Sequence, residues 1–410
     1  MSEASSTLGD VIRRFGPALR EQRGAALTPA QDAVLAALGR CRTAALGGHL
    51  YRCDHCGSEH PAYNSCRSRH CPSCLGHKSA QWLDARAKEV LPAPYFHVVF
   101  TVPEPIAALA LGNKKLLYGI LFRAAAQTLL EIAADPKHLG ATIGFLAILH
   151  TWTQTLLHHP HLHCVVPGGG LSPDGTRWVP CRESFFLSVK VLSALFRGKF
   201  LAFLEEAARR KEVRFAGSTV ALAEPAAWAT FIQKMRSEAW VVYAKPPFGS
   251  PEQVLKYLAR YTHRVAISNS RIVSLTDEYV SFRYRDRKRG DVSRTMTLGG
   301  VEFLRRFLLH VLPKGFVRIR HFGLFANRLR KSTLERCREL LGGPMPAVAA
   351  PPKIEGEARP DVRPEGHDDG EAHLCPLCGV GRLHHVAILL REHVALTSHS
   401  SRPVPAPDTS

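Results

Sequence analysis

The sequence predicts an α+β fold in the central part of the chain and a metal-stapled segment before it. Over residues 83–342, short runs of β-branched and aromatic residues alternate with longer stretches of helical periodicity. Residues 48–82 are rich in cysteine, histidine, serine and arginine but poor in aliphatic residues, so they need a staple in place of an apolar core. With 410 residues, of which 45% are hydrophobic, the chain can hold two or three domains.

The sequence predicts both helices and strands. Residues 1–47 form a helical segment, in which Thr28-Pro29 opens a helix. Helices are expected over Lys114–Ala134, 186–211 and Glu252–Tyr261, the last capped by Ser250-Pro251. Residues 343–372, rich in proline, glutamate and alanine, read as a disordered linker, and residues 373–410 form a tail with a CxxC pair. The expected strands are Tyr95–Val102, Phe145–Thr151, the run HPHLHCVV, Val265–Ser268, Arg271–Leu275, Tyr279–Tyr284, Arg294–Leu298 and Phe316–His321.

Charge and cysteine content narrow the class of protein. The chain carries 54 Lys and Arg against 35 Asp and Glu, a formal charge of +19, which favours a nucleic-acid partner. Neither a signal peptide nor an apolar run of membrane-spanning length is visible, so a cytoplasmic, nucleoid-associated protein without a membrane partner is expected. The 11 cysteines, several in CxxC pairs, indicate metal binding rather than disulfides in that compartment.

The segment His158–Gly170, HHPHLHCVVPGGG, contains the pattern His161-Leu162-His163. In an extended strand, alternate side chains share a face, so both imidazoles point the same way while Leu162 points into the core. Two histidines so placed can hold a divalent metal ion. Taken alone, the pattern also fits a chance structural pair.

Two CxxC pairs in the cysteine-rich segment predict a structural zinc site. Cys53 and Cys56 are followed by Cys71 and Cys74, and two such pairs complete a tetrahedron. Cys66 and His70 are alternative ligands. In the tail, Cys375 and Cys378 indicate a possible second zinc site.

Two tyrosines, Tyr257 and Tyr261, lie four residues apart in the helix predicted over Glu252–Tyr261 and therefore share one face. Such a pair alone is usually a packed stripe, but Lys256, Arg260 and Arg264 surround it with positive charge. Cations and a bound metal favour the phenolate and stabilise charge on an attacked phosphate. DNA contacts are also expected from the arginines of the later strands, namely Arg283, Arg285, Arg318 and Arg320, with Phe282 and Tyr284 placed to stack on bases.

These motifs together resemble the HUH-type transposases of the insertion sequence 91 family. The matching stretches are NSCRSRHCPSC (64–74), YFHVVFTVP (95–103), LHTWTQTLLHHPHLHCVVPGGG (149–170), YAKPPFGSPEQVLKYLARYTHRVAISNSRI (243–272) and HVLPKGFVRIRHFGLFAN (310–327). The resemblance covers residues 15–342 and the CPLCG tail. It implies an HUH endonuclease-like antiparallel sheet with flanking helices and a central two-histidine strand.

The resemblance also implies a reaction: nicking and rejoining of single-stranded DNA, at transposon ends and target site, through a 5′-phosphotyrosine. Tyr257 and Tyr261 match the tyrosine pair, and His161 and His163 match the metal-binding histidines, with Gln154 the candidate third ligand. The catalytic ion is Mg²⁺ or Mn²⁺ beside the structural Zn²⁺. No phosphate-binding loop is visible, so strand displacement falls to host replication or helicase factors. The alternatives are a plasmid replication initiator or relaxase of the same chemistry, and a non-catalytic zinc-dependent DNA-binding protein.

Overall fold

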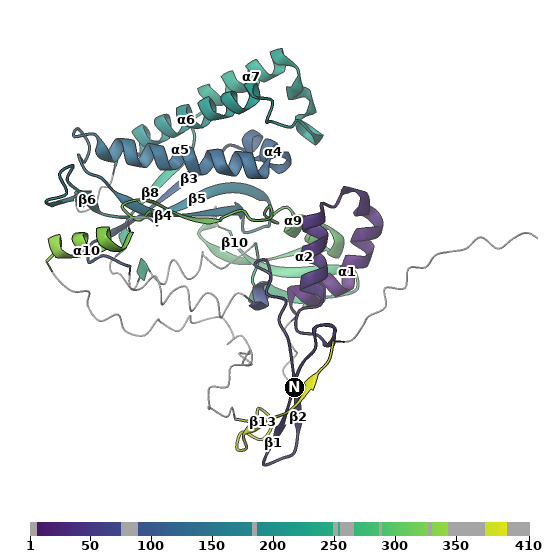
Figure 1. Ribbon diagram of the computed structural model, residues 1–410. Coiled ribbons are helices and arrows are strands. Elements are labelled where there is room, and N and C mark those ends of the chain that lie inside the picture. The colour runs from purple at the N-terminus through teal and green to yellow at the C-terminus, as the bar shows by residue number, and fades with distance from the viewer. Residues whose placement is uncertain are drawn as a thin grey trace, which may run out of the picture. The chain divides into compact units, whose positions relative to one another are not determined.

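The computed structural model describes residues 6–74, 89–182, 187–248, 253–254, 266–286, 289–326, 330–342 and 374–391 (Figure 1). The chain divides into two compact units. The larger unit comprises residues 1–39 and 68–361, and the smaller comprises residues 40–67 and 362–410. The larger unit combines helices with antiparallel sheets, which confirms the predicted mixture of α and β structure.

A five-stranded antiparallel sheet forms the centre of the larger unit. Its strand order is β12-β4-β5-β3-β8, so β5, the histidine strand, lies in the middle. Residues 153–157 join β4 directly to β5 as a hairpin. The strands are β3 (Tyr95–Thr101), β4 (Gly144–Trp152), β5 (His158–Pro167), β8 (Val242–Phe248) and β12 (Ile319–Gly323).

Four helices cover one face of this sheet (Figure 1). Phe100, Leu149 and Leu162, each 0% exposed, point into that helical layer from three neighbouring strands. α5 is long and apolar enough to cross a membrane, but 67% of its most apolar stretch is buried inside the protein, as in a core helix. The four are α4 (Glu104–Gly112), α5 (Lys114–Ala134), α6 (Val189–Arg209) and α7 (Pro225–Ser237).

The opposite face of the sheet carries a smaller apolar cluster and the histidines. Ile148 and Val165 pack there against Leu334 and Cys337 of α10 (Arg330–Leu340), a helix that the sequence did not predict. Because strand side chains alternate, His161 and His163 share this face with Val165, whereas Leu162 and Cys164 enter the helical layer. The predicted alternation of the histidine strand therefore matches the packing.

A second sheet lies in the same unit, with strand order β11-β10-β9. Its helix α9 (Gly300–Leu308) packs against α1 (Leu8–Arg23), which begins with a capping box between Thr7 and Asp10 and is followed by α2 (Pro29–Gly39). The strand predicted over Val265–Ser268 is not found in the described residues 266–268, which precede a short 3₁₀ turn. The strands are β9 (Ile272–Leu275), β10 (Tyr279–Asp286) and β11 (Val292–Gly299); β6 (Gly169–Leu171) and β7 (Trp178–Pro180) form a separate pair.

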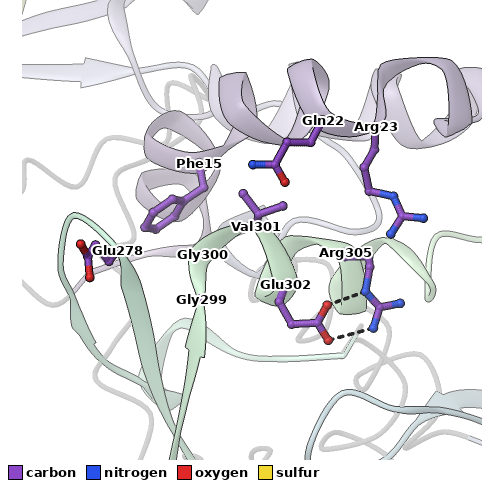
Figure 2. A pocket seen from close by; sticks show the side chains of 9 residues that line it. All are labelled: Phe15, Gln22, Arg23, Glu278, Gly299, Gly300, Val301, Glu302 and Arg305. Atoms are coloured by element: carbon purple, nitrogen blue, oxygen red, sulfur yellow. Dashed lines mark hydrogen bonds and ion pairs between the residues drawn. The ribbon is translucent and has the colours of Figure 1, made fainter.

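A pocket lies where α1 meets the start of α9 (Figure 2). Phe15 and Val301 form apolar parts of its lining, and Arg23 and Arg305 contribute charge. Arg305 is held by both carboxylate oxygens of Glu302, at 2.5 and 2.8 Å. None of the site residues predicted from the sequence lines this pocket.

The smaller unit is a three-stranded antiparallel sheet of order β13-β1-β2. β1 (Gly48–Cys53) and β2 (Glu59–Tyr63) form a hairpin, and β13 (Leu383–Leu389) from the C-terminal tail pairs with β1. The sequence placed residues 48–82 and the tail 373–410 in separate domains; the structure instead joins parts of both in one sheet, because β1 offers an edge to β13. The predicted linker, 343–372, lies outside the described residues.

Candidate metal centre

Three histidines converge on the face of the central sheet opposite the helical layer. His150 of β4 lies opposite His161 of β5 in the antiparallel register, and His163 follows two residues later on the same face. One ring nitrogen from each lies within 4.8 Å of the others. His150 and His163 are 3% and 8% exposed, so the histidine group is largely shielded from water. Three imidazoles at this spacing fit a divalent transition-metal ion.

Hydrogen bonds orient two of these rings. Nδ1 of His161 donates to the carbonyl oxygen of His159 at 2.7 Å, and in the neutral form of the ring this makes Nε2 the nitrogen with a lone pair for a metal. Nδ1 of His163 lies 2.7 Å from Nε2 of the buried His97 on β3, and the two rings are stacked at an interplanar angle of 7°. Both contacts are of the kind that fixes the tautomer of a metal-binding histidine.

The β4–β5 hairpin that carries this histidine group is anchored by side chains from elsewhere. Arg271 donates to the carbonyl oxygen of Gln154 at 2.5 Å, and Arg306 to that of Thr155 at 3.3 Å. His310, which is 1% exposed, lies between Thr151 Oγ1 at 3.2 Å and the carbonyl oxygen of Leu156 at 3.1 Å. These contacts hold the turn and with it the register that sets His150 opposite His161.

Sequence reasoning missed His150 and His97. The signal for His150 was available, because a hairpin joining Phe145–Thr151 to the histidine strand brings the ends of both strands together. Gln154, the predicted third ligand, is exposed in the turn and contributes its carbonyl oxygen to the Arg271 contact. Its role as a ligand stays a prediction, and His150 is the better-placed candidate because it belongs to the histidine group.

The predicted nucleophiles, Tyr257 and Tyr261, lie outside the described residues, as do Lys256, Arg260 and Arg264. The preceding residues, Gln253 and Val254, are helical. Val254 is 1% exposed and belongs to the apolar cluster that contains Ile148 and Val165. Val254 therefore packs on the sheet face that carries the histidine group.

The basic residues predicted on later strands have different surroundings. Arg283 and Arg285 are exposed on β10, and Arg285 pairs with Asp291 at 3.1 Å. Burial, with the charge of Arg69 adding to it, lowers the pKa of Arg318 to about 10. The guanidinium of Arg320 lies 4.2 Å above the ring of Phe122, on the helix-covered face. DNA contact by Arg283 and Arg285 fits their exposure; Arg320 is a packed cation–π partner.

Phe282, predicted to stack on bases, does not have the exposure for that role. It is 0% exposed and packs against Phe303 of α9, with ring centroids 5.6 Å apart. The alternation of β10 turns Phe282 into the interior and its neighbour Arg283 outward.

The cysteines do not group into the two sites that the sequence predicted, one with four cysteines and a possible second one in the tail. Cys53 and Cys56 lie with Cys375 and Cys378, and their four sulfur atoms fall within 4.8 Å of one another. The predicted set of Cys53, Cys56, Cys71 and Cys74 is therefore corrected: strand pairing of β13 with β1 brings the tail pair to the first knuckle. The remaining pair, Cys71 and Cys74, belongs to the larger unit, whereas Cys66 belongs to the smaller one.

His70, the other alternative ligand, has a different role. It is 5% exposed, and its Nε2 accepts a hydrogen bond from the amide of Leu312 at 3.2 Å. Burial, with Arg69 nearby, lowers the pKa of His70 to about 3 and keeps the ring neutral. A signal for the observed cysteine grouping was present in the sequence: Gly57 and Gly379 both follow a CxxC pair, whereas Leu75 follows the pair at Cys71.

An antiparallel sheet presenting three histidines and, in the smaller unit, a group of four cysteines fit a metal-binding protein of mixed α/β architecture. Comparison with known proteins gives the family. A family model described as "Putative transposase" matches residues 144–333, and one described as "Transposase zinc-binding domain", for insertion sequence 91 transposases, matches residues 11–102. No solved structure matches the chain.

Two curated relatives extend this match over most of the chain. "Putative transposase y4qJ" of Sinorhizobium fredii (strain NBRC 101917 / NGR234) is 52% identical over 383 residues, covering 93% of this chain and 95% of the relative. "Transposase for insertion sequence element IS801" of Pseudomonas savastanoi pv. phaseolicola is 28% identical over 370 residues, covering 85% of this chain and 82% of that one. The chain belongs to the insertion sequence 91 family of transposases, with its zinc-binding domain, and its substrate is DNA.

Proposed function

We propose that this transposase nicks and rejoins single-stranded DNA by tyrosine attack, in the manner of the HUH endonucleases, during rolling-circle-type transposition. One observation supports the proposal. The histidine group and the buried Val254, three residues before Tyr257, lie on the same face of the central sheet. The reaction needs a metal site and a tyrosine nucleophile, and the shared face supports this assignment.

The reaction is a transesterification. The phenolic oxygen of Tyr257 or Tyr261 attacks a backbone phosphorus and forms a 5′-phosphotyrosine, while the bond from phosphorus to the 3′ oxygen breaks. The phenolic proton is lost, and the departing 3′ oxygen ends as a hydroxyl. Because one phosphodiester replaces another of similar energy, rejoining by a 3′-hydroxyl needs no nucleoside triphosphate. A second tyrosine permits a second cut.

His150, His161 and His163 would hold the divalent ion, Mg²⁺ or Mn²⁺, which when bound acts as a Lewis acid on a phosphate oxygen. Histidine ligands favour Mn²⁺ over Mg²⁺. The carbonyl oxygen of His159 and the ring of His97 orient the ligand rings. The formal charge of +19 supports binding of the DNA backbone, with Arg283 and Arg285 as exposed contacts.

The test is a covalent-adduct assay in Mn²⁺ with a single-stranded oligonucleotide from the end of the element. Wild-type protein is expected to form a protein–DNA adduct that survives denaturation, and the Tyr257→Phe, Tyr261→Phe double variant is expected to form none. Tyr279→Phe is the matched control, since Tyr279 is an exposed strand tyrosine of the same unit. An adduct that persists in the double variant would show that neither tyrosine is the nucleophile.

The same assay separates the alternatives. A non-catalytic zinc-dependent DNA-binding protein would bind the oligonucleotide and form no adduct with any variant. A replication initiator or relaxase would form the adduct with a plasmid origin rather than with the element's end. Host replication or helicase factors would supply strand displacement in the transposase, and a cytoplasmic location fits this reaction.

A further inference from the structure

We propose that Cys53, Cys56, Cys375 and Cys378 bind one structural Zn²⁺ ion, which clips the C-terminal segment 374–391 to the β1–β2 hairpin. This zinc clip joins two segments that are 319 to 325 residues apart in the chain, and half of it lies outside the zinc-binding domain that the family model matches, residues 11–102. The argument for the zinc clip does not depend on the proposed nicking reaction.

The two halves of the zinc clip have the same local design. In each, the residue after the second cysteine is a glycine with positive φ, +67° at Gly57 and +68° at Gly379. The amide of Gly57 donates to the carbonyl oxygen of Cys53 at 3.1 Å, and that of Gly379 to Cys375 at 2.9 Å. Each turn thus presents two sulfur atoms on one side, as a zinc knuckle does.

The sulfur atoms of opposite knuckles have the spacing of a tetrahedral site. Cys53 Sγ lies 3.7 Å from Cys378 Sγ, and Cys56 Sγ lies 3.8 Å from Cys375 Sγ. Zinc–sulfur bonds of about 2.3 Å in a regular tetrahedron place sulfur atoms about 3.8 Å apart. Backbone amides at Cys56 and Gly381 donate to Cys53 Sγ and Cys378 Sγ, at 3.5 and 3.3 Å, which favours thiolates.

Backbone pairing sets the two knuckles face to face. Cys53 pairs with Leu383 in the β1–β13 register. The amide of Asp54 donates to the carbonyl oxygen of Arg382 at 3.1 Å, and the amide of Arg382 donates back to Asp54 Oδ1 at 2.8 Å. The knuckles are 319 to 325 residues apart in the chain, so only folding brings them together.

The smaller unit lacks the apolar core that would hold the tail without a metal. Among its described residues, the buried hydrophobic side chains are three cysteines and Ala62. The larger apolar residues of the tail are exposed, with Leu377 at 73%, Ile388 at 68% and Leu390 at 85%. A sheet this small with so little buried apolar area needs a cross-link to be stable, and a zinc ion bound by four thiolates supplies one.

The test is zinc content per chain of the full-length protein. Cys375→Ser with Cys378→Ser is expected to lose one zinc, and Cys53→Ser with Cys56→Ser is expected to lose one as well. The variant with all four changes is expected to lose the same single ion. Cys181→Ser, which is not part of the zinc clip, is the control and keeps the wild-type content. Full zinc content after removal of the tail pair, or a loss of two ions in the fourfold variant, would overturn the proposal.

A second measurement uses the unsubstituted ligands, so it does not depend on a variant that folds. A protease recognition sequence is inserted at a position within residues 350–366 and is cleaved after purification. The tail fragment is expected to stay bound to the rest of the chain and to leave when a chelator has removed the zinc. A fragment that dissociates at once with zinc present, or that stays bound after zinc loss is verified, would contradict the zinc clip.

Discussion

His97 and His163 lie on adjacent strands with parallel rings, and Nε2 of His97 is 2.7 Å from Nδ1 of His163. His97 is not in the histidine group, but it is 5% exposed and bonded to one of its members. A hydrogen bond to the far nitrogen of a ligand ring fixes the ring's orientation and tautomer. We therefore propose that His97 is a positioning residue of the candidate metal centre.

His97→Ala is expected to weaken Mn²⁺ binding about 10- to 100-fold, the usual cost of removing such a partner. His97→Gln keeps a polar group near Nδ1 of His163 and is expected to recover part of the affinity. Isothermal titration with Mn²⁺ measures both, and His138→Ala, an exposed histidine of the same unit, serves as the control. Unchanged Mn²⁺ affinity in His97→Ala would show that the contact does not support the site.

The third ligand can be decided between His150 and Gln154. His150 lies within the histidine group, whereas Gln154 is exposed in the turn, so His150→Ala is expected to lower Mn²⁺ affinity by at least about tenfold and Gln154→Ala to leave it nearly unchanged. Metal titration and adduct yield measured in parallel check this. The opposite order of effects would restore Gln154 as the ligand.

The two tyrosines are expected to differ from each other. If one attacks first and the other serves the second strand, each single phenylalanine variant keeps a distinct part of the reaction. We expect one variant to abolish the first adduct and the other to keep it but lose strand transfer, on a substrate that reports both steps. Equal loss of both steps in each variant would mean that the tyrosines act as one unit.

The sequence predicted the parts of this protein better than their assembly. Helix Lys114–Ala134 and the alternation of His161, Leu162 and His163 follow from local periodicity, which residues 114–134 and 158–167 carry unambiguously. The position of His150 depends on hairpin register, which follows from the length of the turn rather than from periodicity. The cysteine grouping depends on a pairing between β1 and β13, two strands that lie far apart in the chain, and strand periodicity does not show that pairing.

Acid is expected to destabilise the fold through buried neutral histidines. Burial, with Lys114 nearby, lowers the pKa of His310 to about 3, from 6.5. Between these values the unfolded chain binds a proton that the folded chain does not, so stability falls as pH drops from 6.5 toward 3, by up to about 1.4 kcal/mol per pH unit for this one group. His310→Gln is expected to reduce that slope while lowering stability at pH 7.5 by about 1–3 kcal/mol, because its two hydrogen bonds anchor the β4–β5 turn.

Urea midpoints measured across this pH range test the role of His310. The slope below pH 6.5 should be shallower in His310→Gln than in the wild type, with equal denaturant m-values. An unchanged slope would mean that His310 is already protonated in the folded protein, or that other groups dominate.

A single added methyl group should disturb the zinc clip without removing a ligand. Gly381 lies three residues after Cys378 of the tail knuckle, and a Cβ there would overlap Cys53 Sγ and lie 2.6 Å from His55 Cβ. Gly381→Ala is therefore expected to push Cys53 away from Cys378 and to speed zinc release to a chelator by at least about tenfold. Gly119→Ala places the same methyl group in open space on α5, where it should leave zinc release unchanged and stabilise the helix by up to about 1 kcal/mol. Zinc release followed with a colorimetric chelator separates the two variants, and equal rates would show that close approach at Gly381 does not shape the site.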